Sequence, residues 1–300
     1  MTASKREGGA LNVDAYISDD SSFYGDEELR SYLEEQSAEF DPLEWWAHQK
    51  PSIQTGAPSS VQRGTGSDKS HLYNPYADQI QGRQLSESVA AFLGRAPPSS
   101  TSVEEYGPWI FIANPHASRR PLDEDLAGLA RTGQELLDAF MTEKTQIEEQ
   151  LRGRPEAVIK RAVTKARKPV EEALLHAATE KRCTSGKWML FPSPGIVDHV
   201  WGLIAKSTAA NELGIAAKVA TKPAGDDRAS RLICIYTADF ADQHDVRRVL
   251  HKLVELGAVD RSAAIYYKCD TFTHLGINSR NPYGFKASMY ASKELLARGA

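Results

Sequence analysis

The fold of this chain is decided between Gly186 and Tyr290, where short strand-like and helix-like segments alternate. They read GKWMLF (186–191), VDHVWGLIAKSTAANELG (197–214), IAAKVAT (215–221), RLICIYT (231–237), DVRRVLHKLVELG (245–257) and AAIYYKCDTFTHLGI (263–277). The strand-like pieces are short apolar runs, whereas apolar residues in the helix-like pieces recur every three or four positions. This order predicts an α+β fold in which helices pack on one face of a curved, mostly antiparallel sheet. We expect the opposite face to be open.

Turn and capping residues set the expected ends of these elements. Asp198 and Asp242 are predicted to cap two helices, which end at Gly214 and Gly257. The predicted strands are residues 109–113, 187–191, 215–221, 231–237, 263–270 and 272–277. The third and fourth of these form a predicted hairpin, because the KPAGDD sequence between them is rich in turn-forming residues.

A helical insert separates the first predicted strand from the second. From Pro121 to Arg182 the apolar residues keep a helical spacing that is interrupted at Gly153 and Pro155, so we expect two helices. Residues 152–168 contain seven Lys and Arg side chains and one acidic side chain, a local charge of +6. Such a run is either a solvated helix face or a surface for phosphate or an acidic partner.

Charge is unevenly distributed over the 300 residues. The net charge of −4 divides into −8 for residues 1–104 and +4 for residues 105–300. Because residues 1–104 combine acidic stretches with Pro, Gly and Ser, we expect a mostly disordered segment with short helices, which Trp45 and Trp46 anchor on the body. The α+β domain is expected at 105–292, including the insert 121–182, and residues 293–300 form a predicted C-terminal tail.

Cysteine usage and hydropathy restrict the class of protein. Cys183, Cys234 and Cys269 are widely separated and odd in number, so neither a disulfide framework nor a local zinc site is predicted. The N-terminus lacks the apolar run of a signal peptide, and no window approaches the ~18 apolar residues of a membrane span. We therefore expect a soluble monomer that binds no membrane and resides in the cytoplasm, with the nucleus as the alternative.

Common catalytic motifs are absent from the sequence. It contains no G-x-x-x-x-G-K-[ST] loop, no G-x-S-x-G and no H-E-x-x-H. The one tempting cluster is Cys269, Asp270 and His274, but Cys269 and His274, five residues apart on one strand, would point to opposite faces. The sequence therefore favours a protein without catalytic residues, metal or cofactor. An enzyme that uses Cys269 or His274 on a nucleotide-like substrate is the alternative.

Basic and aromatic residues interleave at the predicted strand positions. Residues two apart on a strand share a face, so Tyr266 and Lys268 point the same way. On an open face, flat rings stack on bases and cations contact phosphates, which predicts binding of RNA or a nucleotide. The candidate residues are Lys187, Trp188, Lys218, Lys222, Arg228, Tyr236, Tyr266, Lys268, Tyr283 and Lys286.

Two other interpretations of these residues stay open. The aromatic residues can belong to the core while the cations extend from strand edges into solvent. Alternatively, the chain is a protein-interaction module. In that case a partner docks on the helical face or on the insert 121–182, and the acidic residues 1–104 regulate access.

Several segments resemble the basophilic leukaemia expressed protein (Bles-like) family. The resemblance covers residues 106–290, and its most specific pieces are SGKW (185–188) and NPYG (281–284). It implies a fold similar to that of the messenger RNA cap-binding translation initiation factor, with matching positions at Gly186, Trp188, Trp201, Lys218 and Lys222. That factor clamps methylated guanine between two tryptophans, whereas residues 115–187 contain neither Trp nor Tyr here. The aromatic pair that cap recognition needs is therefore missing.

Overall fold

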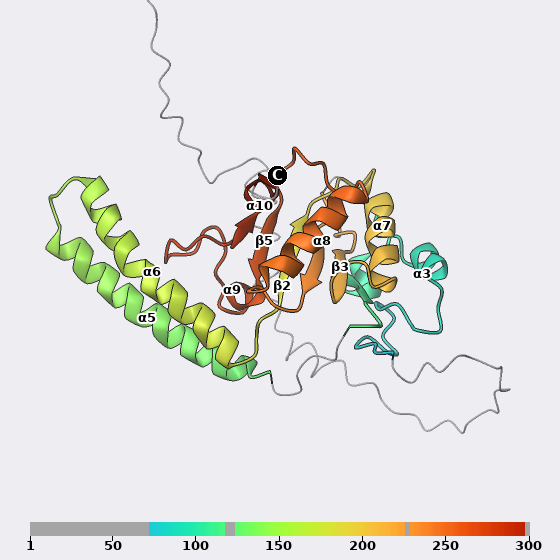
Figure 1. Cartoon of the computed structure of the whole chain (residues 1–300), viewed down its shortest axis with the longest axis horizontal. Helices are drawn as coiled ribbons and strands as arrows, with labels where there is room; N and C mark the ends of the chain where they lie inside the picture. Colours follow the sequence, from blue (N-terminus) through green and yellow to red (C-terminus); the bar gives the residue numbers. More distant parts are fainter. Residues whose placement is uncertain (1–71, 118–123, 226–228, 298–300) are drawn as a thin grey trace, which may run out of the picture. The chain divides into compact units, whose positions relative to one another are not determined.

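The computed structural model describes residues 72–117, 124–225 and 229–297 (Figure 1). The chain divides into two units, Met1–Gln49 and Lys50–Ala300, and every described residue belongs to the second. The predicted anchoring by Trp45 and Trp46, and the disorder predicted before residue 72, lie outside the described residues.

Helices and strands alternate along the described chain. The helices are α3 (Val89–Arg95), α4 (Val103–Tyr106), α5 (Leu126–Gln150), α6 (Glu156–Glu180), α7 (Val197–Ala209), α8 (Gln243–Glu255), α9 (Asp270–His274) and α10 (Ser292–Ala297). The strands are β1 (Trp109–Ala113), β2 (Gly186–Leu190), β3 (Ala216–Ala220), β4 (Ile233–Thr237), β5 (Tyr266–Cys269) and β6 (Tyr290–Ala291).

The six described strands form one antiparallel sheet with the order β1-β3-β4-β2-β5-β6. The predicted α+β class and antiparallel sheet are confirmed. The predicted hairpin is β3–β4, in which Lys218 lies opposite Cys234. Because β2 pairs with both β4 and β5, it occupies the middle of the sheet, and the sheet does not close on itself.

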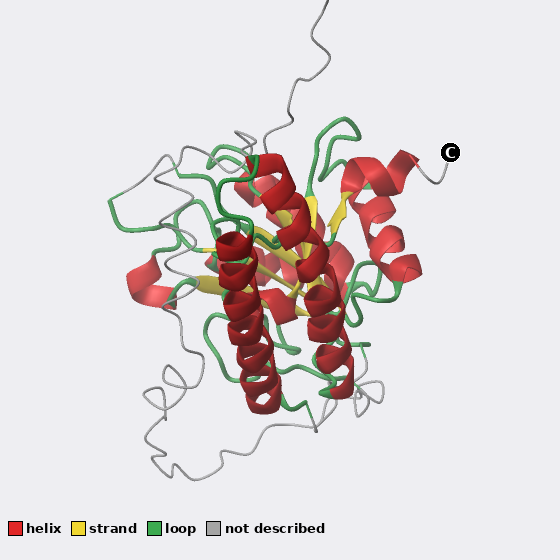
Figure 2. Ribbon diagram, turned by 90° about the vertical axis from the view of Figure 1, so that its left-hand side faces the viewer, coloured by secondary structure: helices red, strands yellow, loops and turns green. Residues whose placement is uncertain are grey.

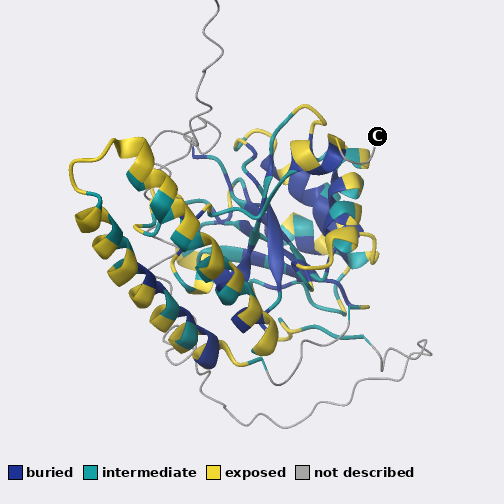
Figure 3. Ribbon diagram, turned by 60° about the vertical axis from the view of Figure 1, so that its left-hand side comes forward, coloured by how far each residue is buried: buried dark blue, intermediate teal, exposed yellow. Residues whose placement is uncertain are grey.

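Buried side chains line one face of the sheet. Side chains alternate along a strand and paired residues share a face, so the register places on this face Ile112, Trp188, Ala217, Ile235 and Tyr267. None of the five is more than 1% exposed. Helix α7 packs on β1 and β3, and α8 packs on β4. This face and the two helices form the hydrophobic core, which Figure 3 shows in the buried colour.

The opposite face of the sheet is mostly half-buried rather than fully open. It carries Trp109, Phe111, Lys187, Met189, Lys218, Cys234, Tyr236, Tyr266 and Lys268. Two neighbours cover parts of it. The Tyr76 ring stacks on Phe111 with 4.8 Å between ring centres, and side chains of α9 reach Lys187.

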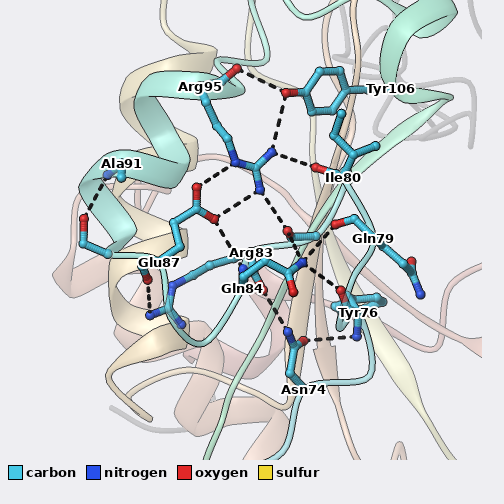
Figure 4. A network of polar contacts seen from close by, with 12 residues as sticks. Asn74, Tyr76, Gln79, Ile80, Arg83, Gln84, Glu87, Ala91, Arg95 and Tyr106 are labelled. Atoms are coloured by element: carbon cyan, nitrogen blue, oxygen red, sulfur yellow. Dashed lines mark hydrogen bonds and ion pairs between the residues drawn. The ribbon is translucent and has the colours of Figure 1, made fainter. Parts of the chain in front are cut away.

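A network of polar side chains holds residues 74–95 against the edge of β1 (Figure 4). The Gln84 side-chain amide donates to the backbone carbonyls of Tyr76, Gln79 and Gly82. Arg95 donates to the carbonyls of Ile80 and Gly82 and forms an ion pair with Glu87 at 2.7 Å. The turn held in this way pairs with β1 through a bridge between Gly82 and Phe111.

The folded body therefore begins earlier than the predicted boundary at residue 105. Phe92 of α3 is fully buried and contacts Trp201 of α7 with 6.5 Å between ring centres. Asp198, the predicted cap of α7, instead accepts hydrogen bonds from the backbone and hydroxyl of Ser99. Short helices were predicted before residue 105, and α3 is one of them. Hydrophobic periodicity could not show that the segment belongs to the body, because polar side chains hold much of it in place.

Two further boundaries differ from prediction. Residues 272–277 are not a strand: Phe272 lies in the short helix α9, which a positive-φ Gly276 follows. The predicted tail at 293–300 contributes to α10, whose Leu295 and Leu296 are buried. Phe272 and Leu275 are three residues apart, which is a helical spacing. The stretch was predicted as a strand because a short apolar run is compatible with either structure.

Gly214 was expected to end a helix, but its role is different. Helix α7 ends at Ala209, before a positive-φ Asn211. A Cβ atom at Gly214 would lie 1.8 Å from the Tyr236 carbonyl oxygen. Gly214 therefore allows the chain entering β3 to approach β4 closely. Asp242 and Gly257, by contrast, bound α8 as predicted.

The predicted insert forms a long antiparallel hairpin of α5 and α6 (Figure 2). Only its near half is buried, through residues such as Leu129, Phe140 and Leu174, and both helices contact α9 there. Residues 141–173 contain no buried side chain. None of the helices in the described part of the chain is both long and apolar enough to span a bilayer.

Removal of the Arg95 side chain should destabilise the body. Arg95→Ala leaves two backbone carbonyls and Glu87 without their cation, so we expect the free energy of unfolding to fall by roughly 2–3 kcal/mol. Urea denaturation measures this change. Arg261→Ala, at an exposed position, is the control and should stay within about 0.5 kcal/mol of the parent protein. Equal stability of the two variants would show that the network does not hold residues 74–95.

Candidate functional site

A buried ion pair lies on the half-buried face of the sheet. The Lys187 Nζ atom of β2 lies 2.5 Å from Asp270 Oδ1 and 3.0 Å from Thr273 Oγ1. Asp270 also accepts a 2.6 Å hydrogen bond from Ser185 Oγ. Burial opposes the charge on both groups, but their mutual attraction and hydrogen bonds outweigh it. The pKa of Asp270 is held well below its ordinary value, and the pKa of Lys187 is raised.

Lys218 of β3 has a different environment. Its Nζ atom lies 3.8 Å from the ring centre of Trp109 and 5.9 Å from that of Tyr236. Among the described residues, no carboxylate or other acceptor bonds to it. Burial lowers the pKa of Lys218 to about 8, and the charge of nearby Lys187 acts in the same direction. Lys218 is thus a desolvated cation held by aromatic rings rather than by an anion.

The Tyr236 ring joins the two lysines. Lys187 Nζ lies 5.6 Å from its centre, so the ring lies within reach of a paired and an unpaired cation. Lys268 of β5 lies opposite Lys187 in the register, and Tyr266 lies opposite Met189. The structure therefore brings five predicted residues onto one face: Lys187, Lys218, Tyr236, Tyr266 and Lys268.

Other predicted residues lie elsewhere. Trp188 is fully buried on the opposite face, where its indole donates to the Val246 carbonyl of α8, because neighbouring strand residues alternate. Lys222 follows the end of β3, and its backbone bonds to Thr101 and Val103. Arg228 lies outside the described residues.

Tyr283 and Lys286 lie on none of the described strands. They belong to the loop between α9 and β6, and this loop contacts the middle of both helices of the α5–α6 hairpin. Phe285 of this loop is buried and contacts Phe140 of α5 with 5.8 Å between ring centres. Lys144 and Arg167 donate to loop carbonyls from the two long helices.

The lysine and aromatic cluster consists of the five residues that share this face together with Trp109 and Asp270. Sequence reasoning missed Trp109 and Asp270 as members of the cluster. Trp109 comes before Lys218 by more than 100 residues, and only the pairing of β1 with β3 brings them together. Asp270 was considered only beside Cys269 and His274. Cys269 is buried on the helix-covered face, where burial raises its pKa to about 12, so it carries no reactive thiolate at neutral pH. The described residues contain no group of His, Cys, Asp and Glu side chains arranged to hold a metal ion.

Together, these features define an α+β protein whose antiparallel sheet is covered by helices on one face and carries a lysine and aromatic cluster on the other. The family model for the basophilic leukemia-expressed protein Bles03 matches residues 33–276. The chain belongs to this family. The match includes β1 to β5, and thus every residue of the cluster.

The two lysines should affect stability in opposite ways. Lys187→Met leaves Asp270 buried without its cation, so the free energy of unfolding should fall by about 3–5 kcal/mol. Lys218→Met removes a desolvated charge while keeping an apolar side chain against Trp109, so stability at pH 7 should be equal or higher. Urea denaturation of both variants measures the difference. A similar loss in both would mean that Lys218 is stabilised by its surroundings.

The effect of Lys218 should also depend on pH. Its pKa of about 8 in the folded protein lies below the ~10.4 of an unfolded chain, so the unfolded state binds more protons between these values. Folding is therefore penalised below pH 8, and the penalty disappears as the pH approaches 10. Any stability advantage of Lys218→Met should shrink over the same interval, and a constant difference would contradict the lowered pKa.

Proposed function

We propose that this protein binds RNA or a nucleotide, without catalysis, through the half-buried face of the sheet. The observation that carries the proposal is the position of the Lys218 ammonium beside the rings of Trp109 and Tyr236, with no carboxylate partner among the described residues. In the part of the chain that the structure describes, this cation has no negatively charged partner, and a phosphate can supply one. The flat rings beside it can stack on a base.

The charges on this face divide the proposed roles. Lys187 is neutralised by Asp270, so we assign it a positioning role in holding β2, α9 and the Tyr236 ring together. Lys218 and Lys268 are the proposed phosphate contacts, with Lys222 just beyond the end of β3. Tyr236 and Tyr266 are the proposed stacking surfaces, because they share this face with the two lysines.

We propose that the fold is similar to that of the cap-binding translation initiation factor. Cap recognition is not part of the proposal. That factor uses two tryptophans on either side of one guanine. Here the Trp109 ring is in contact with the Lys218 ammonium. This arrangement favours contacts with phosphate and a single stacked base over a guanine clamp. The three free, buried cysteines fit a reducing compartment such as the cytoplasm.

A second candidate is docking of a partner protein on the α5–α6 hairpin. Residues 141–173 of the hairpin contain no buried side chain, and α6 carries exposed cations that include Lys160, Arg161 and Lys165. A helix pair of this kind presents a surface to an acidic protein as readily as to RNA. RNA-binding measurements on variants of the sheet and of the hairpin separate the two candidates.

The proposal predicts RNA binding that weakens with salt. Fluorescence anisotropy of a labelled single-stranded oligonucleotide between about 50 and 200 mM KCl measures the slope of affinity against salt. Replacing Lys218 and Lys268 by Gln should weaken binding and reduce the slope by about 1.4, at ~0.7 for each lost phosphate contact. Lys206→Gln, an exposed position on α7, should leave both values unchanged.

Unchanged affinity in the double variant would reject this site on the sheet. If binding is then lost when Lys160, Arg161 and Lys165 become Glu, the RNA contact belongs to the hairpin. If neither set of changes affects binding, RNA is bound elsewhere and the proposed site fails. If the parent protein binds no RNA, the RNA proposal fails and the docking candidate remains.

RNA affinity should fall as pH rises from about 7 to 9. Lys218 is mostly protonated below its pKa of about 8 and mostly neutral above it, so its phosphate contact is lost over this interval. Lys218→Arg, which keeps its charge, should bind with little change over the same range. The same anisotropy measurement tests both proteins, and an equal decline in both would exclude Lys218 as the titrating contact.

A further inference from the structure

Lys218 is surrounded by groups that leave its amine without an anionic partner. The titratable and charged side chains that the described strands place on its face are Lys187 on β2, Cys234 and Tyr236 on β4, and Tyr266 and Lys268 on β5, with Asp270 contributed by α9. The carboxylate of Asp270 is already bonded to Lys187 and Ser185. Cys234 is buried, and burial raises the pKa of its thiol, so it supplies no negative charge.

The arrangement makes the neutral amine of Lys218 more accessible than it is in an ordinary lysine. Burial and a second cation nearby both destabilise an ammonium, as the lowered pKa of Lys218 indicates. A neutral amine is a nucleophile, whereas an ammonium is not. The side chain is half-buried rather than fully buried, and Trp109 and Tyr236 provide flat surfaces against which a planar molecule can lie.

We propose that Lys218 is a reactive amine that captures a planar aldehyde or ketone as an imine. In this step the neutral Nζ atom attacks the carbonyl carbon, and a C–N bond forms. The carbonyl oxygen then leaves as water and carries away the two protons of the amine. The product is a C=N bond between Lys218 and the ligand, and no oxidant or reductant is needed.

The geometry singles out Lys218 from its neighbours. Lys187 donates to Asp270 and Thr273 and is almost fully buried, so its nitrogen is committed to bonds within the protein. Lys222 lies beyond the end of β3, in the chain between β3 and β4, and so is not on the sheet face that carries Lys218. In contrast, Lys218 combines an aromatic environment with an amine that no described acceptor bonds.

This inference goes beyond RNA binding, because the imine needs only the amine and a carbonyl compound. The two properties are nevertheless opposed in their dependence on pH. Phosphate binding requires the ammonium, which prevails below about pH 8, whereas imine formation requires the amine, which prevails above it. A ligand that occupies the face should therefore protect Lys218 from carbonyl reagents.

The test uses the full chain and pyridoxal 5′-phosphate as the carbonyl probe. Borohydride reduction traps the imine, and peptide mass spectrometry gives the labelled fraction of each lysine over time. At about pH 7.5 we expect Lys218 to react at least tenfold faster than Lys222 and Lys206, because a pKa of about 8 leaves a substantial share of the Lys218 amine neutral at that pH. Its rate should rise between pH 7 and 8 and level off toward pH 9, once most of the amine is neutral.

Two variants guard against a misleading result. Lys218→Arg should lose the fast-labelled site while keeping a cooperative thermal transition. Tyr236→Ala should admit water beside the amine, raise its pKa and slow its labelling several-fold at pH 7.5. Labelling of Lys218 at the same rate as Lys206, or unchanged rates in Tyr236→Ala, would overturn the proposal. Fast labelling of Lys218 without RNA affinity would support the reactive amine and reject the RNA function. RNA affinity without fast labelling would support the RNA function and reject the reactive amine.

Discussion

The ion pair between Lys187 and Asp270 is the interaction on which this face of the protein depends. It joins the central strand β2 to α9, and Ser185 and Thr273 complete its hydrogen bonds. A buried carboxylate is stable only with a nearby cation, so α9 must lie at the end of β5 where Asp270 reaches Lys187. Because this carboxylate is committed to Lys187, it gives Lys218 no charge partner.

The same pair explains why two lysines on adjoining parts of one sheet differ so much. Lys187 is held by an anion, and Lys218 by the rings of Trp109 and Tyr236. A cation–π contact is worth about 0.5–2 kcal/mol, which only partly offsets the loss of water around an ammonium. The position of Lys218 is therefore unfavourable for folding in itself. Residues that are costly for stability often serve binding or chemistry, and this relation motivates both functional proposals.

Residues that precede β1 cover part of this face. Residues 74–95 are fastened to the edge of β1 by Gln84, Glu87 and Arg95, and they place the Tyr76 ring over Phe111. At the other end of the sheet, the loop that carries Phe285 joins the core to the α5–α6 hairpin. The lysine and aromatic cluster lies on the strands between these regions, so a ligand of this face would meet β1, β3, β4, β2 and β5.

Much of the fold follows from local sequence. Apolar runs and turn residues predicted β1, β2, β3 and β4, and the spacing of apolar residues predicted α5, α6 and α8, because these signals depend on neighbours in the chain. The helix α9 was missed, since a short apolar stretch suits strand or helix. Short helices were expected before residue 105, but the polar network that makes residues from 72 part of the folded body leaves no periodic signal and was missed. Lysines and aromatics on alternate strand positions also indicated which residue types line the site.

Only the tertiary structure decided how those residues combine. Trp109 contacts Lys218 because β1 pairs with β3, and Asp270 neutralises Lys187 because β5 pairs with β2. Trp188 was excluded because its position in the register turns it toward α8. The sequence thus determined the elements and the kinds of side chain they carry. Strand pairing, which joins residues distant in the chain, determined which lysine keeps a partner and which does not.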